Sequence, residues 1–557
     1  MKKSLFVIVG ILMVSTMLWG GGNRAATTTT TSDPNSPLDL TVFKMDVRVR
    51  PTASNPMYQY LKEKLNVTFE WDFLVGDIAQ RRGTMIAGGQ YPDLLEIRES
   101  GFIDAGATIP IEGLIEQYAP RIKAFYEQAG VWRQMFSPDG HLYHLINYGA
   151  FQGIDHTPNY DQAAFWIQKA VLKDAGYPKI TTVDQYFALI QDYYRRNPTI
   201  NGQPTIPFVI LTYDWRAFEL WNPPNFLAGN PNDGNGVVNP RTYEYKTFFT
   251  QDISKRWFQR LNQLNQQGLI DRASFTDNYD QYQAKISSGR VLGQSVQGWQ
   301  FGSADNANRD RGENIRTMAP LPIVWDENTR PWYRNVTIPN LFRGVSISVS
   351  AKDPVRIMRF FDQYMTEDVQ RTMSWGIEGK DWQWQGSGTS RIPYRTEAQR
   401  ANWNNQDWQE QNRALLVSDF MCKIQGSFSD GFPTDLSQYL PEREATLRVE
   451  DRELYQAYGV AGTNEMMDKN PRPNTPWFPT WNMPNPPDGS AAQIALQRCE
   501  ETMKRLLPQM ILAAPAQFET LWAAYVREME VTNNISVYER YMQEQLNQRL
   551  RDWGVVR

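Results

Sequence analysis

The sequence predicts an α/β protein made of two successive strand-and-helix series and a helical C-terminal region. Residues 38–97 follow the order strand, helix, strand, helix, strand. A second series of this kind spans residues 163–295, and residues 491–553 have an almost entirely helical pattern. Parallel strands joined by helices form an open sheet, and such sheets bind ligands at the carboxyl ends of their strands. A length of 557 residues allows two or three lobes.

The strands and helices of the first series are predicted from hydrophobic periodicity and from residues that typically begin or end helices. A helix starts at Pro56 and carries Met57, Leu61 and Leu65 at helical spacing, so this face is expected to cover a sheet. Alternation over Val67–Phe73 predicts a strand with one buried face. We expect strands at 40–43, 67–73 and 93–97, and helices from 56 and at 80–87, 111–118 and 121–129.

The second series contains an explicit helix start. Thr182 followed by Gln185 is a capping box, which predicts a helix over Val183–Arg196. We expect further strands at 163–167, 206–211, 290–295 and 344–350, and further helices at 168–175, 254–267, 279–287 and from Pro354, which Asp353 caps.

Three features interrupt the regular patterns. Residues 222–240 are rich in Asn, Gly and Pro, and a loop of this length is usually functional or mobile. Residues 470–489 are proline-rich and are expected to cross the surface as a strap. The helical C-terminal region is expected to break near Pro508 and Pro515.

Composition narrows the classes of function. The net charge is −4 at pH 7 and no run of five basic residues occurs, so binding to nucleic acid is not expected. Aromatic residues make up 13% of the chain, with 19 Trp among them. Most of these rings should pack in the core, but rings with an apolar face and a polar edge also stack on sugars. The composition therefore favours a carbohydrate ligand.

The N-terminal segment predicts export. Lys2 and Lys3 precede an apolar run over Leu5–Leu18, and small residues follow, as in a secretory signal peptide. We assign residues 1–26 to this signal and 27–37 to a flexible tether, and we place the protein in the periplasm or on the extracellular face of the cell membrane. The apolar run is shorter than the ~20 residues of a membrane span; an uncleaved anchor is the alternative.

The chain has two cysteines, Cys422 and Cys499. In an oxidising compartment they either pair or remain as two buried thiols, and their spacing does not decide between these states. Neither lies near the signal cleavage region, so lipid attachment at that point has no support.

Five segments resemble a known family. They are YLKEKLNVTFEW, MIAGGQYPDLLE, IPIEGLIEQYAPRIKAF with SPDGHLY, FWIQKAVLKDAGYPKITTVDQYFALI and FDQYMTEDVQRTMSWGIEG. Their order and spacing are similar to those of the extracellular solute-binding proteins of ABC importers, in the long, lipoprotein-like oligosaccharide-binding branch of the family-1 class. The resemblance covers the chain from about Leu38 to Trp553.

The resemblance implies a two-lobed periplasmic-binding-protein-like fold with a hinge and a ligand held between the lobes. Lobe 1 would comprise residues 38–158 and 336–384, lobe 2 residues 159–335, and a mostly helical region 385–557 would pack on both. Closure around an oligosaccharide would present the loaded form to an ABC-type membrane permease. We expect a monomer that has no cofactor and is not an enzyme.

Two positions depart from the family pattern. Gly20-Gly21-Gly22 stands where relatives often carry a lipid-attachment cysteine. Residues 197–202 (NPTING) correspond to a loop that resembles a calcium site in many relatives, but Asn197 and Thr199 lack carboxylates and no acid follows before Phe208. We therefore expect no calcium at this loop, although the turn at Gly202 is expected to persist.

Motifs for catalysis are scarce. The chain has three histidines, His141, His144 and His156, and neither a G-x-S-x-G elbow nor a phosphate-binding loop. His141 and His144 lie at a turn that leads into a strand, where their spacing places them on opposite faces, so ordinary hydrogen-bonded histidines are expected. A secreted glycosidase that uses two carboxylates is the alternative function. A sensor that hands its loaded state to a membrane kinase is a third hypothesis.

Candidate ligand-binding residues follow strands or lie where the chain crosses between lobes. Aromatic faces would stack on sugar rings and charged groups would pair with hydroxyls; the alternatives are core packing for each ring and an ion pair for each charge. Arg48, Arg98 and Arg343 would suit an acidic glycan if they converge. The complete set is Asp46, Arg48, Asp93, Arg98, Trp215, Trp299, Trp332, Tyr333, Arg343, Trp375 and Glu378. No catalytic residue and no metal ligand is assigned.

Overall fold

The computed structural model describes residues 33–555 except 77, 99, 138, 147–158, 161, 337–339, 342, 420, 424 and 474. The predicted signal (1–26) and the first part of the predicted tether (27–32) lie outside the described residues. No helix in the described part of the chain is both long and apolar enough to span a bilayer. The end of the predicted tether is not free, because Asn66 Nδ2 donates to Asn35 O at 2.8 Å and Arg356 Nε donates to Ser36 O at 2.9 Å.

Lobe 1 is built on a five-stranded sheet in the order β2-β1-β3-β15-β4. β1 pairs in parallel with β2 and β3, whereas β15 is antiparallel to β3 and β4. The strands are β1 (Leu38–Lys44), β2 (Val67–Phe73), β3 (Leu94–Ile97), β4 (Leu145–Ile146) and β15 (Gly344–Ile347). The carboxyl ends of β1 and β3 and the start of β15 therefore lie at one edge of the sheet.

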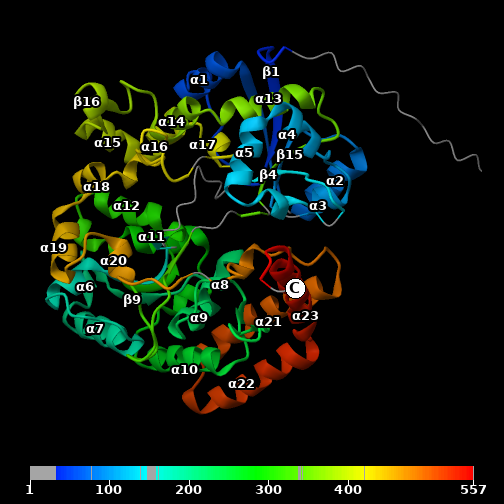
Figure 1. The fold of residues 1–557 in the computed structure, drawn as a ribbon. Helices are drawn as coiled ribbons and strands as arrows, with labels where there is room; N and C mark the ends of the chain where they lie inside the picture. Colours follow the sequence, from blue (N-terminus) through cyan, green and yellow to red (C-terminus); the bar gives the residue numbers. More distant parts are fainter. Residues whose placement is uncertain are drawn as a thin grey trace, which may run out of the picture.

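Helices cover this sheet as the sequence predicts. Asn55 caps the first of them by accepting from Met57 N at 3.0 Å, and Met57, Leu61 and Leu65 are buried in the core of the lobe. Asp353 caps a later helix by accepting from Arg356 N at 2.9 Å. The helices of this lobe are α1 (Pro56–Leu65), α2 (Ile78–Gly88), α3 (Gly101–Asp104), α4 (Glu112–Tyr118), α5 (Pro120–Gln128), α13 (Pro354–Tyr364) and α14 (Glu367–Trp375) (Figure 1).

Lobe 2 is built on a four-stranded sheet in the order β13-β6-β12-β9. The strands are β6 (Ala163–Gln168), β9 (Ile206–Val209), β12 (Val291–Gln297) and β13 (Met318–Leu321). Only β9 and β12 are parallel neighbours; β6 is antiparallel to both β12 and β13. This sheet is therefore mixed, whereas the alternating series suggested parallel pairing throughout.

The helices of lobe 2 also agree with the predicted ranges to within a few residues. The predicted capping box is confirmed, since Gln185 N donates to Thr182 Oγ1 at 3.3 Å and Thr182 N donates to Gln185 Oε1 at 3.1 Å. The helices are α6 (Lys169–Asp174), α7 (Val183–Arg196), α8 (Phe218–Trp221), α9 (Pro223–Leu227), α10 (Asp252–Gln266), α11 (Tyr279–Ser287) and α12 (Gly302–Asp310).

The stretch 222–240 is not the mobile loop that its composition suggested. It contains α9 and β10 (Gly236–Val238), which pairs with β11 (Tyr245–Thr247). Asn225 is fully buried and donates to Pro231 O at 2.6 Å, so the polar residues of this stretch close internal turns instead of facing solvent.

The loop at 197–202 is a tight hairpin between β7 (Thr199–Ile200) and β8 (Gln203–Pro204). Asn201 and Gly202 have φ values of 49° and 73°, the backbone that an Asn-Gly hairpin turn requires. The expected persistence of the turn is confirmed.

The C-terminal region divides between the lobes. Leu416, Val417, Met421 and Cys422 pack in the core of lobe 1. The elements on that side are β16 (Gln383–Gln385), β17 (Ile392–Tyr394), α15 (Glu397–Asn404), α16 (Gln406–Asn412), α17 (Leu415–Ser418) and α18 (Leu440–Thr446). The helices α19 (Val449–Tyr458), α20 (Thr463–Met467), α21 (Ala491–Leu512), α22 (Phe518–Arg527) and α23 (Ser536–Asp552) follow on lobe 2.

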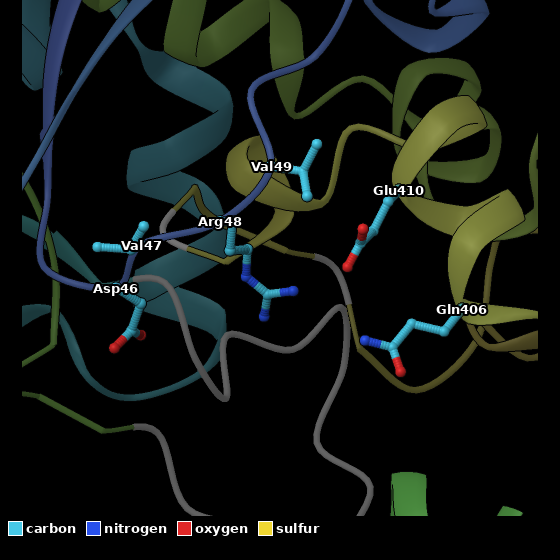
Figure 2. Close-up of a pocket in the computed structure, with 6 residues that line it drawn as sticks. All are labelled: Asp46, Val47, Arg48, Val49, Gln406 and Glu410. Carbon is cyan, nitrogen blue, oxygen red and sulfur yellow. The ribbon is translucent and has the colours of Figure 1, made fainter. Parts of the chain in front are cut away.

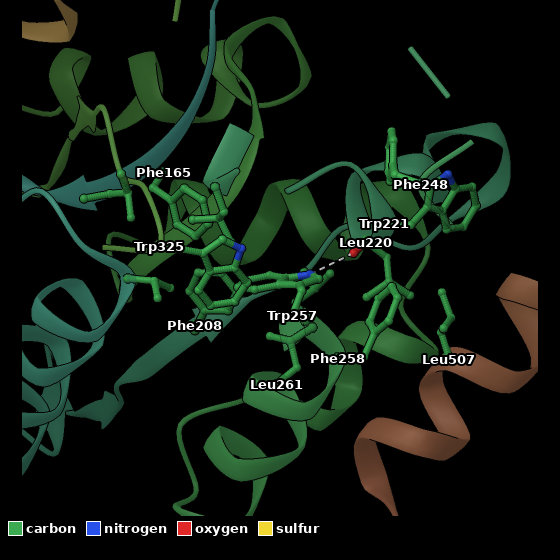
Figure 3. Close-up of a cluster of buried hydrophobic side chains, with 14 of the residues drawn as sticks. Phe165, Phe208, Leu220, Trp221, Phe248, Trp257, Phe258, Leu261, Trp325 and Leu507 are labelled. Carbon is green, nitrogen blue, oxygen red and sulfur yellow. Dashed lines mark hydrogen bonds between the residues drawn. The ribbon is translucent and has the colours of Figure 1, made fainter. Parts of the chain in front are cut away.

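The core of lobe 2 extends into these last helices. Figure 3 shows Leu507 of α21 beside Phe258 of α10, next to a group of buried rings around Trp257. Trp257 Nε1 donates to Leu220 O at 3.2 Å, so this buried ring has its polar atom paired.

The expected break near Pro508 is wrong, whereas the chain does leave the helix before Pro515. α21 continues through Pro508 to Leu512. An internal proline costs a helix about 3 kcal/mol. Leu507, Met510 and Ile511 are all buried around it, and this packing outweighs the lost hydrogen bond.

The described elements of the two lobes alternate along the sequence at three points. The chain passes from β4 to β5 (Asn159–Tyr160), returns from β14 (Arg334–Asn335) to β15, and passes again from α18 to α19. β5 and β14 pair antiparallel, so the first two crossings run side by side at lobe 2. The third crossing was not anticipated from the sequence.

The predicted strap at 470–489 contacts both lobes. On lobe 2, Arg549 Nη1 of α23 donates to Trp477 O at 3.0 Å. Toward lobe 1, Asn482 Oδ1 accepts from Leu341 N at 3.0 Å and Asp488 pairs with Arg82 of α2. The strap is therefore a fixed element of the structure.

The two cysteines are free and buried. Cys422 belongs to the core of lobe 1 and Cys499 to that of lobe 2, so the two thiols lie in different lobes and do not pair. Burial raises the pKa of each thiol to about 12, which keeps both protonated and unreactive at neutral pH.

The packing of α21 on lobe 2 predicts a large effect of one truncation. Leu507→Ala is expected to lower the free energy of unfolding by about 2–5 kcal/mol, because it opens a cavity between α21 and α10. Leu512→Ala, at the exposed end of the same helix, should cost less than about 1 kcal/mol. Urea denaturation of both variants measures the difference, and equal midpoints would contradict the packing described above.

Candidate ligand-binding site

The edge of lobe 1 that carries the ends of β1 and β3 holds a buried ion cluster. Lys44 Nζ lies 3.1 Å from Glu96 Oε1, and neither side chain is exposed to solvent. Arg98 Nη2 lies 2.9 Å from the same oxygen, and Met45 N donates to Glu96 Oε2 at 2.7 Å. Burial alone would raise the pKa of Glu96, but the Lys44 and Arg98 charges hold it below its ordinary value. Glu96 is therefore a fixed anion.

Four predicted site residues surround this cluster. Arg98 Nη1 contacts Asp46 Oδ1 at 3.3 Å, and Arg343 Nη2 lies 4.0 Å from Glu96 Oε1. Arg48 Nε pairs with Asp419 Oδ2 at 2.9 Å. Arg98 and Arg343 thus meet at Glu96, with Asp46 beside Arg98, whereas Arg48 is held by Asp419.

A cavity of about 600 Å³ opens beside this edge. It is lined by Asp46, Val47, Arg48 and Val49, which follow β1, and by Gln406 and Glu410 of α16. Figure 2 shows the Arg48 guanidinium and the Glu410 carboxylate directed into it from its two sides. Polar groups at the carboxyl end of a strand beside an open concavity form the usual ligand site of an α/β sheet.

Lobe 2 contributes a wall of aromatic rings. Trp215 and Trp299 stack with centroids 5.8 Å apart and planes 14° apart, and they are 57% and 53% exposed. Phe218 stacks on Trp215 at 6.2 Å. The Arg216 guanidinium lies over Trp215 at 4.6 Å and over Tyr279 at 4.1 Å. Two large stacked rings left half exposed are a platform for a flat ligand, such as a sugar ring.

Topology explains why Trp215 and Trp299 meet. Trp215 lies in the turn Asp214–Ala217 that follows β9, and Trp299 lies in the turn Gly298–Gln300 that follows β12. Because β9 and β12 are parallel neighbours, their carboxyl ends share one edge. Figure 1 shows α12, which follows the turn that carries Trp299, on the side of lobe 2 that faces lobe 1.

A buried carboxyl group supports this wall from behind. Glu219 of α8 is 2% exposed, and its Oε1 accepts from Gln297 N at 3.0 Å, two residues before Trp299. Tyr279 OH donates to Gln300 O at 2.6 Å on the other side of Trp299. Burial raises the pKa of Glu219 to about 8, so the group is largely protonated at neutral pH.

This raised pKa predicts how stability changes with pH. Between about pH 4.5 and 8 the folded chain holds a proton on Glu219 that the unfolded chain releases, so stability falls as the pH rises through this range. Glu219→Gln keeps an acceptor for Gln297 N and removes the titration. We expect its melting temperature to match that of the native chain near pH 5 and to exceed it at pH 8. A difference that does not change with pH would contradict the assignment.

Three predicted residues lie in positions that leave little or no ring surface for a ligand. Trp375 is fully buried, its Nε1 donates to Pro433 O at 3.1 Å, and Trp382 packs edge-on at 4.7 Å. Tyr333 is 1% exposed and donates to Ile323 O at 2.6 Å. Trp332 is half-buried beneath the Arg472 guanidinium of the strap at 4.9 Å. Trp375 and Tyr333 therefore belong to the core, and Trp332 packs against the strap near the crossing segments.

Asp93 and Glu378 are also separate from the lobe 1 edge. Asp93 precedes β3 and so lies at its opposite end, where its carboxylate accepts from Thr41 N at 2.9 Å and Thr41 Oγ1 at 2.7 Å. It joins β1 to β3. Glu378 is exposed in the turn after α14, where its backbone bridges to Trp382.

Several residues of the site were missed. Four of them come from the C-terminal region, and no local sequence pattern indicates that they lie close to β1. They are Gln406, Glu410, Asp419 and Lys423. Arg216 and Phe218 lie within three residues of Trp215, and this spacing was an available signal.

The described histidines are hydrogen-bonded as expected. His141 Nδ1 lies 2.7 Å from Glu112 Oε1, and His144 Nε2 lies 2.7 Å from Leu341 O; His156 lies outside the described residues. Within the described ranges, no group of three His, Cys, Asp or Glu side chains is placed to hold a metal ion.

No family model matches the chain. The fructooligosaccharide ABC transporter substrate-binding protein FusA of Streptococcus pneumoniae is 27% identical over 257 residues, which are 42% of this chain and 46% of that protein. The match thus spans less than half of the curated relative. Its similarity nevertheless supports the resemblance drawn from the five sequence segments.

Solved structures show the same fold along nearly the whole chain. The complex of FusA from S. pneumoniae with kestose has a TM-score of 0.63 and 16% identity, and the match covers 93% of this chain and all of that one (100%). A solute-binding protein from Bifidobacterium longum infantis, described as binding HMO and associated with an ABC transporter, has a TM-score of 0.61 and 16% identity, with 92% and 99% covered. The resemblance to oligosaccharide-binding solute-binding proteins is confirmed, and the chain has their two-lobed fold.

Proposed function

We propose that the protein is the substrate-binding component of an ABC importer, which captures an oligosaccharide between its lobes and delivers it unaltered to a membrane permease. The observation that carries the proposal is the half-exposed Trp215–Trp299 platform at the carboxyl edge of the lobe 2 sheet. One wall offers ring faces for pyranose or furanose rings and the other offers hydrogen-bonding groups for hydroxyls. We further propose that the protein acts outside the cytoplasm and as a monomer.

Release of the ligand without chemistry follows from the state of the carboxylates. A glycosidase needs one carboxyl group whose pKa is raised beside a second, ionised one. At the lobe 1 edge, neighbouring cations keep the pKa of Asp46 and Glu96 below their ordinary values, even though burial opposes this. Glu219 and Asp305, whose pKa values are raised to about 8 and about 7, are buried and accept from Gln297 N and Met318 N. Both carboxyl groups are therefore enclosed by the protein and hold backbone N–H groups.

The proposed capture involves closure of the lobes. A ligand that contacts both walls binds the closed form more tightly than the open form and shifts the population by that difference. We expect the closure to occur about the points where the chain passes between the lobes, such as the described connection between α18 and α19.

The test is a thermal-shift screen against neutral and acidic oligosaccharides, followed by analysis of the mixture. We expect a rise in melting temperature with at least one glycan and no new reducing ends after prolonged incubation. New reducing ends would favour the glycosidase, and the absence of any stabilising glycan would contradict the proposed function.

A further inference from the structure

We propose that the oligosaccharide is anionic, carrying carboxylate or sulfate groups, and that Arg343 and Lys423 bind one such group. The inference rests on the proposed function and narrows its substrate class. It comes from the way that cations and carboxylates are paired at the lobe 1 edge.

Arg343 has no carboxylate of its own at this edge. Its nearest anionic atom in the described residues is Glu96 Oε1 at 4.0 Å. That oxygen is already held by Lys44 at 3.1 Å and by Arg98 at 2.9 Å. Arg343 Nε is buried without a hydrogen-bond partner, while its side chain as a whole is 37% exposed. The guanidinium thus reaches solvent with donors that the protein does not use.

Lys423 is a second surplus cation. Its ammonium makes no ion pair within the part of the chain that the structure describes. The charges that act on it are one carboxylate, Asp419, and three cations, Arg343, Arg413 and Lys44. Asp419 is itself paired with Arg48 at 2.9 Å. Burial lowers the pKa of Lys423; the Asp419 charge opposes this effect, and the neighbouring cations add to it.

The cations at this edge (Lys44, Arg48, Arg98, Arg343 and Lys423) outnumber its carboxylates (Asp46, Glu96, Asp419 and Glu410) by one, whereas the whole chain has a net charge of −4. Half-buried like charges repel one another and lose hydration, so the arrangement costs free energy in the empty site. A carboxylate or sulfate between Arg343 and Lys423 removes that cost and accepts charge-assisted hydrogen bonds from both. The hydroxyl of a neutral sugar does not compensate the positive charge of Arg343 or of Lys423.

The aromatic surface of lobe 2 is consistent with a ligand that carries its charge on one side only. The one cation of the aromatic wall, Arg216, is paired with Asp214 and covered by the Trp215 and Tyr279 rings. The wall therefore offers ring faces without an unpaired charge. A bound glycan would stack on lobe 2 and direct its acidic group toward lobe 1.

The experiment compares charged and neutral probes by isothermal titration calorimetry. The acidic probes are oligogalacturonates and sulfated, heparin-derived tetrasaccharides; the neutral probes are maltotetraose, cellotetraose and kestose. We expect an acidic probe to bind at least tenfold more tightly than any neutral one, and its affinity to fall when salt is raised from 50 to 300 mM. Lys423→Met and Arg343→Gln should each weaken that binding about tenfold or more.

Two controls separate a binding role from a structural one. Lys255 of α10 forms a surface ion pair with Glu519 of α22. Lys255→Met removes one positive charge there and should leave the affinity for the glycan unchanged. Without ligand, Lys423→Met should melt at the same temperature as the native chain or higher, because it relieves repulsion among Lys44, Arg343 and Arg413.

The outcomes distinguish this inference from the proposed function. Tight binding of a neutral probe that depends on Trp299 but not on Lys423 or Arg343 would overturn the inference and leave the proposed function standing. Binding of neither class of probe would overturn both.

Discussion

A Trp299→Ala variant is expected to bind its glycan about thirtyfold more weakly than the native protein, and Trp215→Ala to lose a similar amount. A buried or sugar-covered Trp at the centre of a binding surface typically contributes about 2 kcal/mol or more, and 1.4 kcal/mol is a factor of ten. Both rings are about half exposed in the structure, so their removal opens no cavity in the core. Calorimetric titration with the glycan identified by thermal shift measures the loss.

The two rings should not act independently. Trp215 and Trp299 stack on one another at 5.8 Å, so removing either also loosens the other. The double variant should therefore lose less than the sum of the two single losses. Tyr458→Ala is the matched control: this ring packs on Tyr177 at 6.3 Å, and its loss should lower stability without changing affinity. Unchanged affinity in both Trp variants would show that the platform is not the site.

Removal of Glu96 should have the largest effect on stability. Glu96→Ala is expected to lower the free energy of unfolding by about 3–5 kcal/mol, because it removes the carboxylate that pairs with the fully buried Lys44. It also removes the acceptor for Met45 N, which orients the segment that lines the cavity. Chemical denaturation followed by fluorescence measures the change.

A double replacement identifies the cause of that loss. Lys44→Met combined with Glu96→Leu removes both charges together, and stability should recover by several kcal/mol relative to Glu96→Ala. Glu116→Ala breaks an exposed pair with Lys123 and should change stability by less than about 1 kcal/mol. A Glu96→Ala variant as stable as the native chain would contradict the buried pair.

Local signals allowed most of the fold to be predicted. The helix that Thr182 and Gln185 start and the strand over Val67–Phe73 were placed correctly because capping and alternation act over a few residues. Pro508 shows the limit of such signals. Its local cost was known, but the compensating contacts with α10 come from some 250 residues away in the sequence.

The same distinction applies to the site. Trp215 and Trp299 were found because each follows a strand, and the pairing of β9 with β12 then brought them together. Trp375 is the last residue of α14, in a segment that resembles the family, yet nothing in the neighbouring sequence indicates that Phe428 and Trp382 enclose it. Lys423 was not selected as a candidate ligand-binding residue, because its proposed role depends on its closeness in space to Arg343 and Asp419.

The central claim is that two separate lobes close on a sugar chain. Small-angle X-ray scattering of the native protein, with and without a saturating glycan, tests this claim most directly, with Trp299→Ala at the same concentrations as the control. The account predicts a smaller radius of gyration for the loaded native protein and no change for the variant. An unchanged radius of gyration in the native protein, with binding verified in the same sample, would contradict it.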